Sequence, residues 1–571
     1  MSRRTKRPNV TEEDIMEILE SDDSSGSDFE DSDDFEPSDE SSSDDDYKSD
    51  EEDNNIVIPN TYPDDEPDDE GNNIIIPNPD PNHVVWSLPR RSFTPRFTIP
   101  DDRKPEVLVD LEPGCLELQC FQKIFPRSLY IFISQCTNER LQILREKKKK
   151  TKDEIRDSDS SEIMLTLGCL LVMSYNKLPN VYDYWSQNPS MGNQAIKLGM
   201  ARNRFQLLMS KLYFNHPKPP TNAPKTYYTD EMVNCLKYTF LNARGESPFQ
   251  SLDEYMTKFK GRSSLKQYMP LKPIKRGIKI WERCDSNTGY TYDFNIYSGK
   301  NESNDTDNRT LGERVVMKLS ETIRDPNVVL AFDRFFTSVR LLTIIDFPAL
   351  GTCIMNRKNV PKFDGKLKRG EHQFRSCSDG LIAARWQDSK DFVVISNCHT
   401  PNVGEITRKQ KDGTKLKVSC PNSIIFYNQI MGGVDLSDQK VSVYDCSRKS
   451  TKWWKKVFYK LLMSAVVNAW ILYNEVNENK TRLLQFLVPL AEQMMATGKA
   501  NCAVKRRRNS GRPSKIAKTL INVGDHLPVE GMSRRRCARC LMKKKETRTT
   551  QMCQMCNLPL CKNCFTLYHT S

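Results

Sequence analysis

The feature that most constrains the fold is a run of paired cysteines near the carboxyl end of this 571-residue chain. A 39-residue segment (533–571) with so few apolar side chains needs a further source of stability, and thiolates spaced C-x-x-C can bind zinc. The pattern predicts a structural zinc domain with seven visible ligands, where two closed tetrahedral sites need eight. The ligands are Cys537, Cys540, Cys553, Cys556, Cys561, Cys564 and His569.

The missing ligand leaves two possibilities open. Either an eighth group comes from elsewhere in the chain, or one of the sites is incomplete, so we expect one or two zinc ions. A ubiquitin-ligase RING is a competing interpretation, but the order and spacing of its ligands fit this segment poorly. A reduced, metal-free tail is the third interpretation and the one we disfavour.

Charge is divided unevenly along the chain, whose formal net charge is +10. Residues 1–70 hold 28 acidic and 5 basic side chains, which leaves a net charge of about +33 on residues 71–571. A body this basic usually meets a polyanion. A lysine-rich surface that only keeps the protein soluble is the alternative.

The acidic amino-terminal region is predicted to be disordered, because one charge sign dominates it and it has too few apolar side chains to bury. Its serines lie among acidic residues and resemble casein kinase II sites, where phosphate would add negative charge. We expect this region to compete with a polyanion for the basic body. A plain solubilising tail is the alternative.

Apolar segments give no sign of export or of a membrane span. No amino-terminal apolar stretch resembles a signal peptide. The longest apolar stretch, residues 457–473, is interrupted by Lys460, Ser464 and Asn468, which predicts a buried helix. We therefore expect a soluble intracellular protein without a membrane partner.

The middle of the chain changes from helical to sheet-forming patterns. Apolar residues recur at helical spacing over about 108–248, and β-favouring residues then flank the turn "SNTG". An amphipathic helix at 309–323, a strand at 327–333, a helix at "LLTIID" and a strand at "ALGTCIM" follow. This order predicts an α/β sheet with parallel and antiparallel parts.

Aspartates stand at the ends of these elements. Asp253 opens the sheet region, Asp333 ends a buried strand, and Asp435 begins a helix after a Gly-Gly pair, with Asp438 one turn further on. Each alone could be a turn residue or a helix cap. Together they indicate a magnesium site, because two Mg²⁺ ions with few carboxylate ligands can serve phosphodiester chemistry.

Longer motifs in the same order resemble the piggyBac family of DNA transposases. They are "SLDEYMTKFKGRSSLKQYMPLKPIKRGIKIW", "FDRFFTS", "YNQIMGGVDLSDQ" and "CSRKSTKWWKKVFY". The lead-in "LPNVYDYWSQNP" and the tail "CNLPLCKNCFTLYHT" are similar to the family as well. The resemblance covers roughly residues 108–571.

This resemblance implies a ribonuclease H-like catalytic domain in which Asp253, Asp333 and Asp435 bind two Mg²⁺ ions, with Asp438 as a nearby fourth acid whose loss is milder. It implies a homodimer that acts on double-stranded DNA. The implied steps are nicking at the transposon ends, attack of the freed 3′ hydroxyl to form hairpins, hairpin opening, and joining at TTAA. It also favours a cross-braced zinc domain that recognises the transposon end.

Basic residues near the first and last aspartates are expected to contact the DNA backbone. Ile354 stands where the family usually has arginine, which predicts a weakened or shifted contact. The basic segment 505–515 is compatible with nuclear import. The predicted DNA contacts are Lys260, Arg262, Lys272, Lys275, Arg276, Arg357, Lys358, Arg448 and Lys449.

The expected function is a magnesium-dependent cut-and-paste transposase located in the nucleus. A domesticated nuclear DNA-binding protein without catalysis is the alternative, and a hydrolytic nuclease of ribonuclease H type is a third hypothesis. The predicted domains are a disordered acidic region at 1–107, an all-helical dimerisation and DNA-binding domain split into 108–248 and 447–500, an α/β ribonuclease H-like catalytic domain split into 249–358 and 421–446, an insertion domain at 359–420, a basic linker at 501–532, and the cysteine-rich zinc domain at 533–571.

Overall fold

The computed structural model divides the chain into two compact units, Met1–Ala503 and Val504–Ser571, and each is described separately. The acidic tail as far as residue 83 and the basic segment 505–515 lie outside the described residues. The structure describes residues 84–152, 154–188, 190–270, 272–299, 308–410, 413–503 and 526–569.

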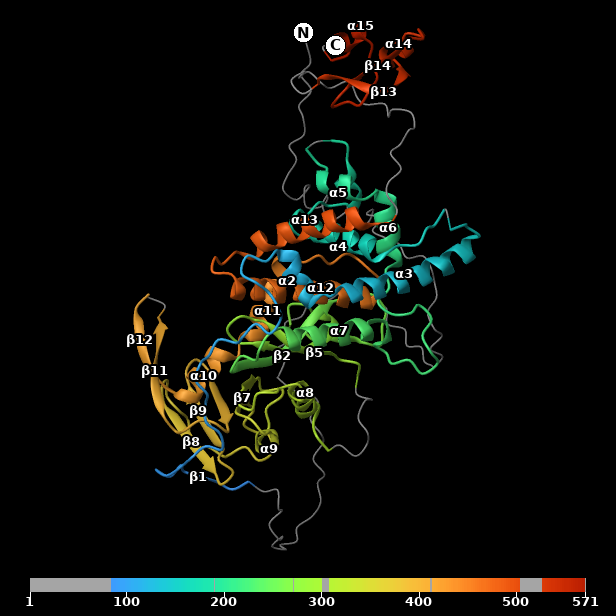
Figure 1. Cartoon of the computed structure of the whole chain (residues 1–571). Coiled ribbons are helices and arrows are strands. Elements are labelled where there is room, and N and C mark those ends of the chain that lie inside the picture. Colours follow the sequence, from blue (N-terminus) through green and yellow to red (C-terminus); the bar gives the residue numbers. More distant parts are fainter. Residues whose placement is uncertain are drawn as a thin grey trace, which may run out of the picture. The chain divides into compact units, whose positions relative to one another are not determined.

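Helices from both ends of the first unit share one large apolar core (Figure 1). Two of these helices, α4 (Ser160–Tyr175) and α13 (Leu483–Asn501), pack along each other although they are far apart in sequence. The others are α2 (Glu117–Ile124), α3 (Arg127–Lys148), α5 (Gln194–Gly199), α6 (Arg202–Lys211), α7 (Tyr227–Ala243) and α12 (Trp453–Val476).

The predicted buried helix at 457–473 lies within α12. Among the described residues, α12 is the one helix long and apolar enough to cross a membrane, and 83% of its most apolar window is buried inside the protein. Its side chains pack on α2, α7, α11 (Gly433–Val443) and α13, as those of a core helix do.

A ten-stranded mixed sheet is the second main part of the first unit. Its strand order is β1-β8-β9-β10-β7-β6-β2-β4-β3, with β5 beside β4. β6 pairs in parallel with both β2 and β7, and the other strand pairs are antiparallel. The strands are β1 (Trp86–Ser87), β2 (Phe249–Lys258), β3 (Lys266–Tyr268), β4 (Arg276–Asp285), β5 (Thr291–Ile296), β6 (Val329–Phe332), β7 (Ala349–Cys353), β8 (His372–Cys377), β9 (Ile382–Gln387) and β10 (Asp391–Ser396).

The predicted order of sheet elements is confirmed. β4 and β5 form the expected hairpin around the "SNTG" turn, and the amphipathic pattern at 309–323 becomes α8 (Leu311–Ser320). α8 and α9 (Val339–Ile344) pack on one face of the sheet, and α10 (Asn422–Ile430) packs on the other.

The predicted insertion domain at 359–420 does not form one separate body. Its strands β8–β10 continue the main sheet through hydrogen bonds between β10 and β7. Only β11 (Val403–Lys409) and β12 (Lys415–Pro421) make a hairpin of their own. Weak patterning hid these strands because both faces of β9 and β10 are largely buried, so their polar and apolar residues do not alternate.

The predicted disordered region, 1–107, ends too late. Trp86 lies in β1, which pairs with β8, and its indole N–H donates to the carbonyl oxygen of Asn359 at 2.7 Å. Phe97 N–H donates to the carbonyl of Asn397 at 3.0 Å. Strand pairing and these hydrogen bonds therefore fix residues from about 84 onward to the sheet.

From the buried histidine His399 we predict how acid affects the stability of the first unit. His399 is buried, its Nδ1 lies 2.8 Å from Ser396 Oγ, and its Nε2 has no hydrogen-bond partner. Burial lowers the pKa of His399 from 6.5 to about 4, so the unfolded chain binds this proton more tightly. The free energy of unfolding should therefore fall as the pH drops from 6.5 to 4, by about 3 kcal/mol at most from this group.

Urea unfolding of the wild type and of His399→Gln, each at neutral pH and near pH 4, measures this contribution. The variant should lose less stability on acidification than the wild type. An identical loss in the two proteins would show that His399 does not carry the effect.

Candidate functional site

The pairing of β2 with β6 places two of the predicted aspartates side by side. In this parallel pair Leu252 lies opposite Phe332, so Asp253 and Asp333 occupy the next position along the two chains. Neighbouring strands lie about 4.8 Å apart. Leu252 and Phe332 face the α8 side of the sheet, and alternation along the strands puts the two aspartates on the opposite face.

The third aspartate comes from α11 (Gly433–Val443), which packs on β2 and β4 on that same face. Val434 N–H donates to Ser251 Oγ at 3.2 Å, two residues before Asp253. A Cβ atom on Gly433 would lie 2.6 Å from Ser251 Oγ and 2.8 Å from the carbonyl oxygen of Asp285. Glycine therefore lets the start of α11 lie close against Ser251 and Asp285, which carries Asp435 to the face of the sheet that holds the other two acids.

Neither Asp333 nor Asp435 is a helix cap, which was the simpler interpretation of each. Ser338 caps α9 by accepting a hydrogen bond from Leu341 N–H at 3.0 Å, whereas Asp333 Oδ1 accepts from Phe335 N–H at 2.8 Å. Gly432 is the cap residue of α11, and Asp435 is exposed in its first turn. Their carboxylates are therefore available for another role.

Burial and neighbouring acids disfavour negative charge on the carboxylates at this corner. Burial, together with the neighbouring Glu254, raises the pKa of Asp253 to about 8, and burial also raises the pKa of Asp333. Lys272 pairs with Glu254 at 3.1 Å, and although burial opposes its charge, Asp253 and Glu254 raise its pKa above the ordinary value. Acids held together with so little compensation fit a divalent cation.

The oxygens of the three aspartates do not meet as closely as the ligands of a single closed site. In the described part of the chain, both groups whose ligand atoms all lie within 4.8 Å of one another belong to the second unit. Two Mg²⁺ ions about 3.5 to 4 Å apart would spread their ligands over a wider space, which suits aspartates on three different elements.

Asp438 points to a different partner. Its Oδ1 accepts a hydrogen bond from Lys460 Nζ of α12 at 3.1 Å, and Lys460 also pairs with Glu282 Oε1 of β4 at 3.3 Å. Burial is the main reason that the pKa of Asp438 is raised to about 7. Asp438 therefore belongs to an ion-pair network between α11, α12 and the sheet.

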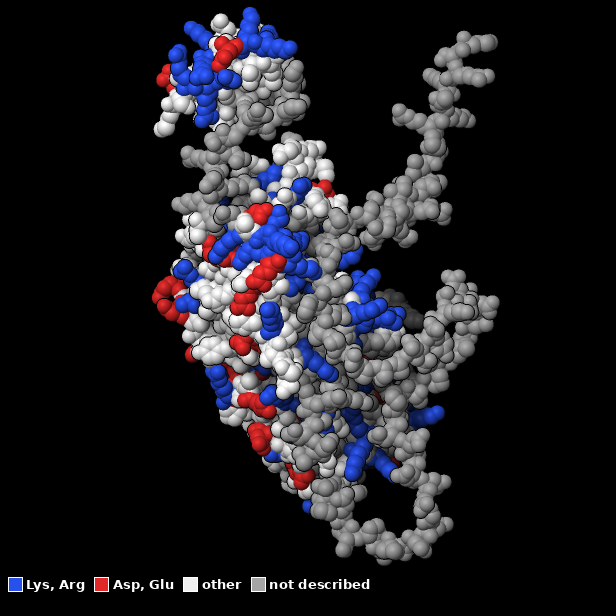
Figure 2. All heavy atoms as spheres, turned by 90° about the vertical axis from the view of Figure 1, so that its right-hand side faces the viewer, with Lys and Arg blue, Asp and Glu red and all other residues white. Residues whose placement is uncertain are grey.

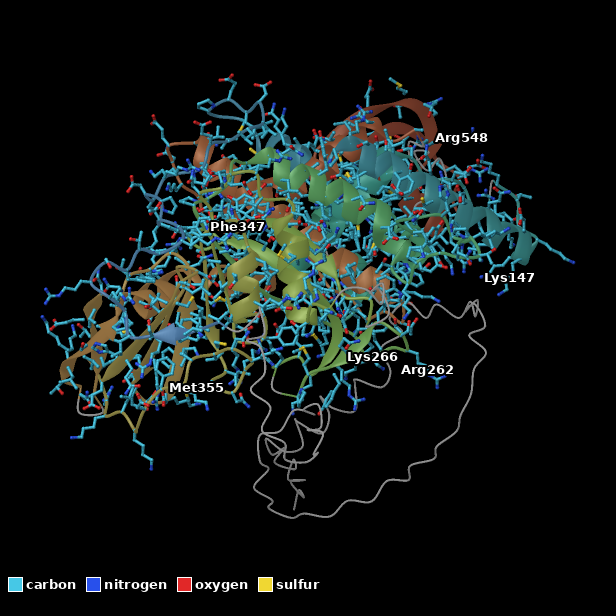
Figure 3. All side chains as sticks on the ribbon, turned by 90° about the horizontal axis from the view of Figure 1, so that it is seen from below. Lys147, Arg262, Lys266, Phe347, Met355 and Arg548 are labelled. Atoms are coloured by element: carbon cyan, nitrogen blue, oxygen red, sulfur yellow. The ribbon has the colours of Figure 1, made fainter. Side chains whose placement is uncertain are left out.

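The predicted DNA contacts fall into two groups. Arg262, one of the predicted contacts, projects near the edge of the unit in Figure 3. The nearby Lys266, which was not among the predicted contacts, donates from Nζ to the carbonyl of Gly261 at 3.0 Å. Lys272 and Arg357 are instead engaged within the protein. Those with exposed side chains are Lys260, Arg262, Lys275, Arg276, Lys358 and Lys449.

The segment around Ile354 follows β7. Ile354 is exposed, and Arg357 donates to the carbonyls of Thr337 and Phe335, so this arginine supports the turn after Asp333. Arg448 is half-buried, with its guanidinium over the ring of Tyr184, 5.7 Å from the centroid. These two arginines have structural partners that the sequence did not reveal.

The second unit supplies the missing zinc ligand, His526. It joins Cys553, Cys556 and His569, whose ligand atoms all lie within 4.8 Å of one another. Cys556 Sγ lies 3.1 Å from His526 Nδ1 and 3.5 Å from His569 Nε2. His569 Nδ1 lies 2.8 Å from the carbonyl of Phe565, a contact that directs Nε2 toward the cysteines.

The other four cysteines form the second cluster. Cys540 Sγ lies 3.8 Å from Cys561 Sγ and 3.6 Å from Cys564 Sγ, separations that fit the edges of a tetrahedron with zinc–sulfur distances of about 2.3 Å. Cys561 N–H donates to Cys537 Sγ at 3.3 Å. Ligands of the two clusters alternate along the sequence, so the predicted cross-braced arrangement is present.

His526 lies within the predicted basic linker, 501–532, and stands alone, eleven residues before the first cysteine of the zinc domain. The sequence does contain a signal for this ligand, because the chain has only six histidines and two of them flank the cysteine pairs. The unit is built on β13 (Pro528–Arg536), β14 (Arg548–Cys553), α14 (Ala538–Met542) and α15 (Lys562–His569).

The surface of this zinc-binding unit is basic. Between residues 526 and 569 there are nine lysines and arginines against two acidic residues. Figure 2 shows Lys and Arg spread over the face of the unit that it presents, with few acids among them. Such a surface suits a phosphate backbone.

Comparisons with known proteins agree with this architecture. The family described as Transposase IS4 matches residues 117–470, and the family described as DDE_Tnp_1-like zinc finger matches residues 524–570. The human PiggyBac transposable element-derived protein 3 is 28% identical over 427 residues, covering 72% of this chain and 70% of that protein. The human PiggyBac transposable element-derived protein 2 is 25% identical and covers 55% of each chain.

A solved structure shares the fold. The cryo-EM structure of the piggyBac transposase synaptic complex with hairpin DNA superposes with a TM-score of 0.63, at 22% identity, over 81% of this chain and 98% of the other.

Proposed function

The chain belongs to the piggyBac family of transposases, and from this premise we propose that it is a DNA transposase that excises and inserts DNA at TTAA sites. The observation that carries the proposal is the parallel register that sets Asp253 beside Asp333, with Asp435 delivered to the same face by Gly433. A purely structural protein has no need for three acids at this crowded corner.

Asp253, Asp333 and Asp435 would hold two Mg²⁺ ions, which would supply the charge that activates an attacking oxygen and stabilises a leaving one. The protein's own part is to position the strands of DNA. Lys260, Arg262 and Lys275 are exposed on the segments beside Asp253 and would contact phosphates without reading sequence.

The reaction would have two chemical stages. Water attacks the phosphodiester at each transposon end and frees a 3′ hydroxyl, which then attacks the opposite strand and closes a hairpin on the excised element. After the hairpin is opened by hydrolysis, the same 3′ hydroxyl attacks a TTAA target and expels a 3′ oxygen from that target. Every step breaks one phosphodiester by in-line displacement.

Several further features belong to the proposal. The mixed sheet would be of ribonuclease H type, and the helical block would provide a homodimer interface. The solved piggyBac structure is a synaptic complex with hairpin DNA, and by analogy double-stranded DNA is the partner of this chain. The basic zinc-binding unit would recognise the transposon end, and the protein would act in the nucleus.

A domesticated DNA-binding protein is the second candidate function. Two observations favour it: Lys272 neutralises part of the acidic corner by pairing with Glu254, and Ile354 replaces the arginine typical of the family. In that case the basic surfaces and the zinc-binding unit would serve binding alone.

Excision of a TTAA-flanked marker in cells separates the two functions. The wild type should excise the marker, and Asp333→Asn should lower excision about a hundredfold or more, because removal of one metal ligand costs several kcal/mol in the transition state. Asp346→Asn is a matched control, because that aspartate is exposed and, among the described residues, its ion pair is with Arg96 at 3.2 Å. A wild type that binds DNA without excision would support the DNA-binding function instead.

A further inference from the structure

Lys460 is a buried lysine at the junction of the helical block and the acidic corner. Its side chain is 2% exposed, and α12 carries it into contact with three other elements. Nζ lies 3.1 Å from Asp438 Oδ1 on α11 and 3.3 Å from Glu282 Oε1 on β4. The same Nζ lies 3.8 Å from the centre of the Tyr255 ring on β2.

Each residue that Lys460 contacts lies close to a predicted metal ligand, either along the same element or on the neighbouring strand. Asp438 follows Asp435 by one turn of α11, and Glu282 lies directly opposite Asp253 in the antiparallel pair of β2 and β4. Tyr255 is two residues beyond Asp253 on β2 and points to the same face. Lys460 therefore touches the strand, the neighbouring strand and the helix that place two of the three aspartates.

The charges at this junction are paired. Burial opposes the charge on Lys460, but Glu282 and Asp438 raise its pKa above the ordinary value, so the ammonium stays charged. Glu282 is 1% exposed, and its cationic partner among the described residues is Lys460. Without Lys460, two carboxylates would face each other with no cation between them, and α11 would be pushed away from the sheet.

We propose that Lys460 is a positioning residue, which fixes α11 against β2 and β4 and so sets the distance of Asp435 from Asp253. This inference rests on the proposed function, because it assigns Lys460 to the binding of catalytic metal. We do not assign Lys460 a direct contact with substrate or metal. Its effect passes through Asp438 and Glu282, and this gives Asp438 a supporting role in place of a ligand role.

The chain offers a matched control on the same helix. Lys455 is 4% exposed, and its Nζ donates to the carbonyls of Met209 and Ser210 at 3.1 and 2.6 Å. It ties α12 to α6 instead of to the acidic corner. Lys455→Met should therefore cost stability without affecting the binding of divalent cations at the three aspartates.

The test is the binding of Mn²⁺ to the full, zinc-loaded chain, followed by electron paramagnetic resonance, with Asp333→Asn as the baseline that defines site-specific binding. In Lys460→Met the site-specific dissociation constant should rise about tenfold, as when partners of metal ligands are removed elsewhere. Asp438→Asn should give a similar rise, and the double variant no further rise. Lys455→Met should stay within about twofold of the wild type.

The outcomes test the proposed catalytic function and the role of Lys460 separately. If the wild type binds no more Mn²⁺ than Asp333→Asn does, the catalytic function itself fails. If the wild type binds but Lys460→Met and Lys455→Met bind equally well, Lys460 is only a structural residue and the inference is overturned. Should Lys460→Met fail to fold, Asp438→Asn decides alone, because its side chain is 26% exposed and its loss removes the same contact.

Discussion

Removal of zinc is expected to unfold the second unit while the first unit stays folded. The described part of the second unit has a small apolar cluster, in which Leu558, Leu560 and Phe565 pack among the cysteines. Binding of structural zinc contributes about 10 kcal/mol or more in small domains of this kind. The helical core of the first unit has no comparable dependence on these ligands.

Limited proteolysis after chelation of zinc measures whether the second unit unfolds while the first unit stays folded. A strong chelator should make the segment beyond residue 526 sensitive to protease and leave a protected fragment that contains the first unit. Added zinc should restore protection. Continued resistance of the second unit after all zinc has been removed would contradict the prediction.

Individual ligands give a sharper form of the same prediction. The wild type should contain two zinc ions per chain, because the structure has two groups of four ligands. His526→Ala should release one of them and leave the cluster of Cys537, Cys540, Cys561 and Cys564 filled. His216→Ala is the control, because His216 is an exposed residue of the first unit beside Glu139.

Gly433→Ala is expected to abolish excision and to destabilise the first unit, whereas Gly432→Ala should do neither. A Cβ on Gly433 would lie within 3.0 Å of three atoms, two of which are backbone atoms of Asp285 that cannot swing away. The extra methyl group should cost about 1 to 3 kcal/mol and move α11, with Asp435, away from the sheet. A Cβ on Gly432 would meet nothing within 4 Å, and its φ is −78°.

Urea unfolding and marker excision should be measured together on both glycine variants. We expect both measurements to distinguish Gly433→Ala from Gly432→Ala, although the two glycines are adjacent and the sequence alone does not distinguish them. Equal behaviour of the variants would show that close approach at Gly433 does not position Asp435. Loss of stability without loss of excision would show that Asp435 tolerates the shift.

Much of the site could be predicted from the sequence because its chemistry lies in local patterns. The C-x-x-C pairs, the acid at the end of an apolar strand and the Gly-Gly-x-Asp turn are each visible in a few residues. The roles of Lys272 and Arg357 were harder to predict from the sequence, since a basic residue near an acid can bind either the protein or DNA. Their partners, Glu254 and the carbonyl of Phe335, become visible only in the folded chain.

The sequence by itself determined the types of element, the zinc chemistry and the family, because these depend on spacing over a few residues or on motifs in a fixed order. Tertiary structure decided which distant residues meet. The register of β2 and β6 joins Asp253 to Asp333, α12 brings Lys460 to Asp438, and the second unit folds His526 back onto Cys553. Such contacts depend on how the whole core packs, and no local pattern encodes them.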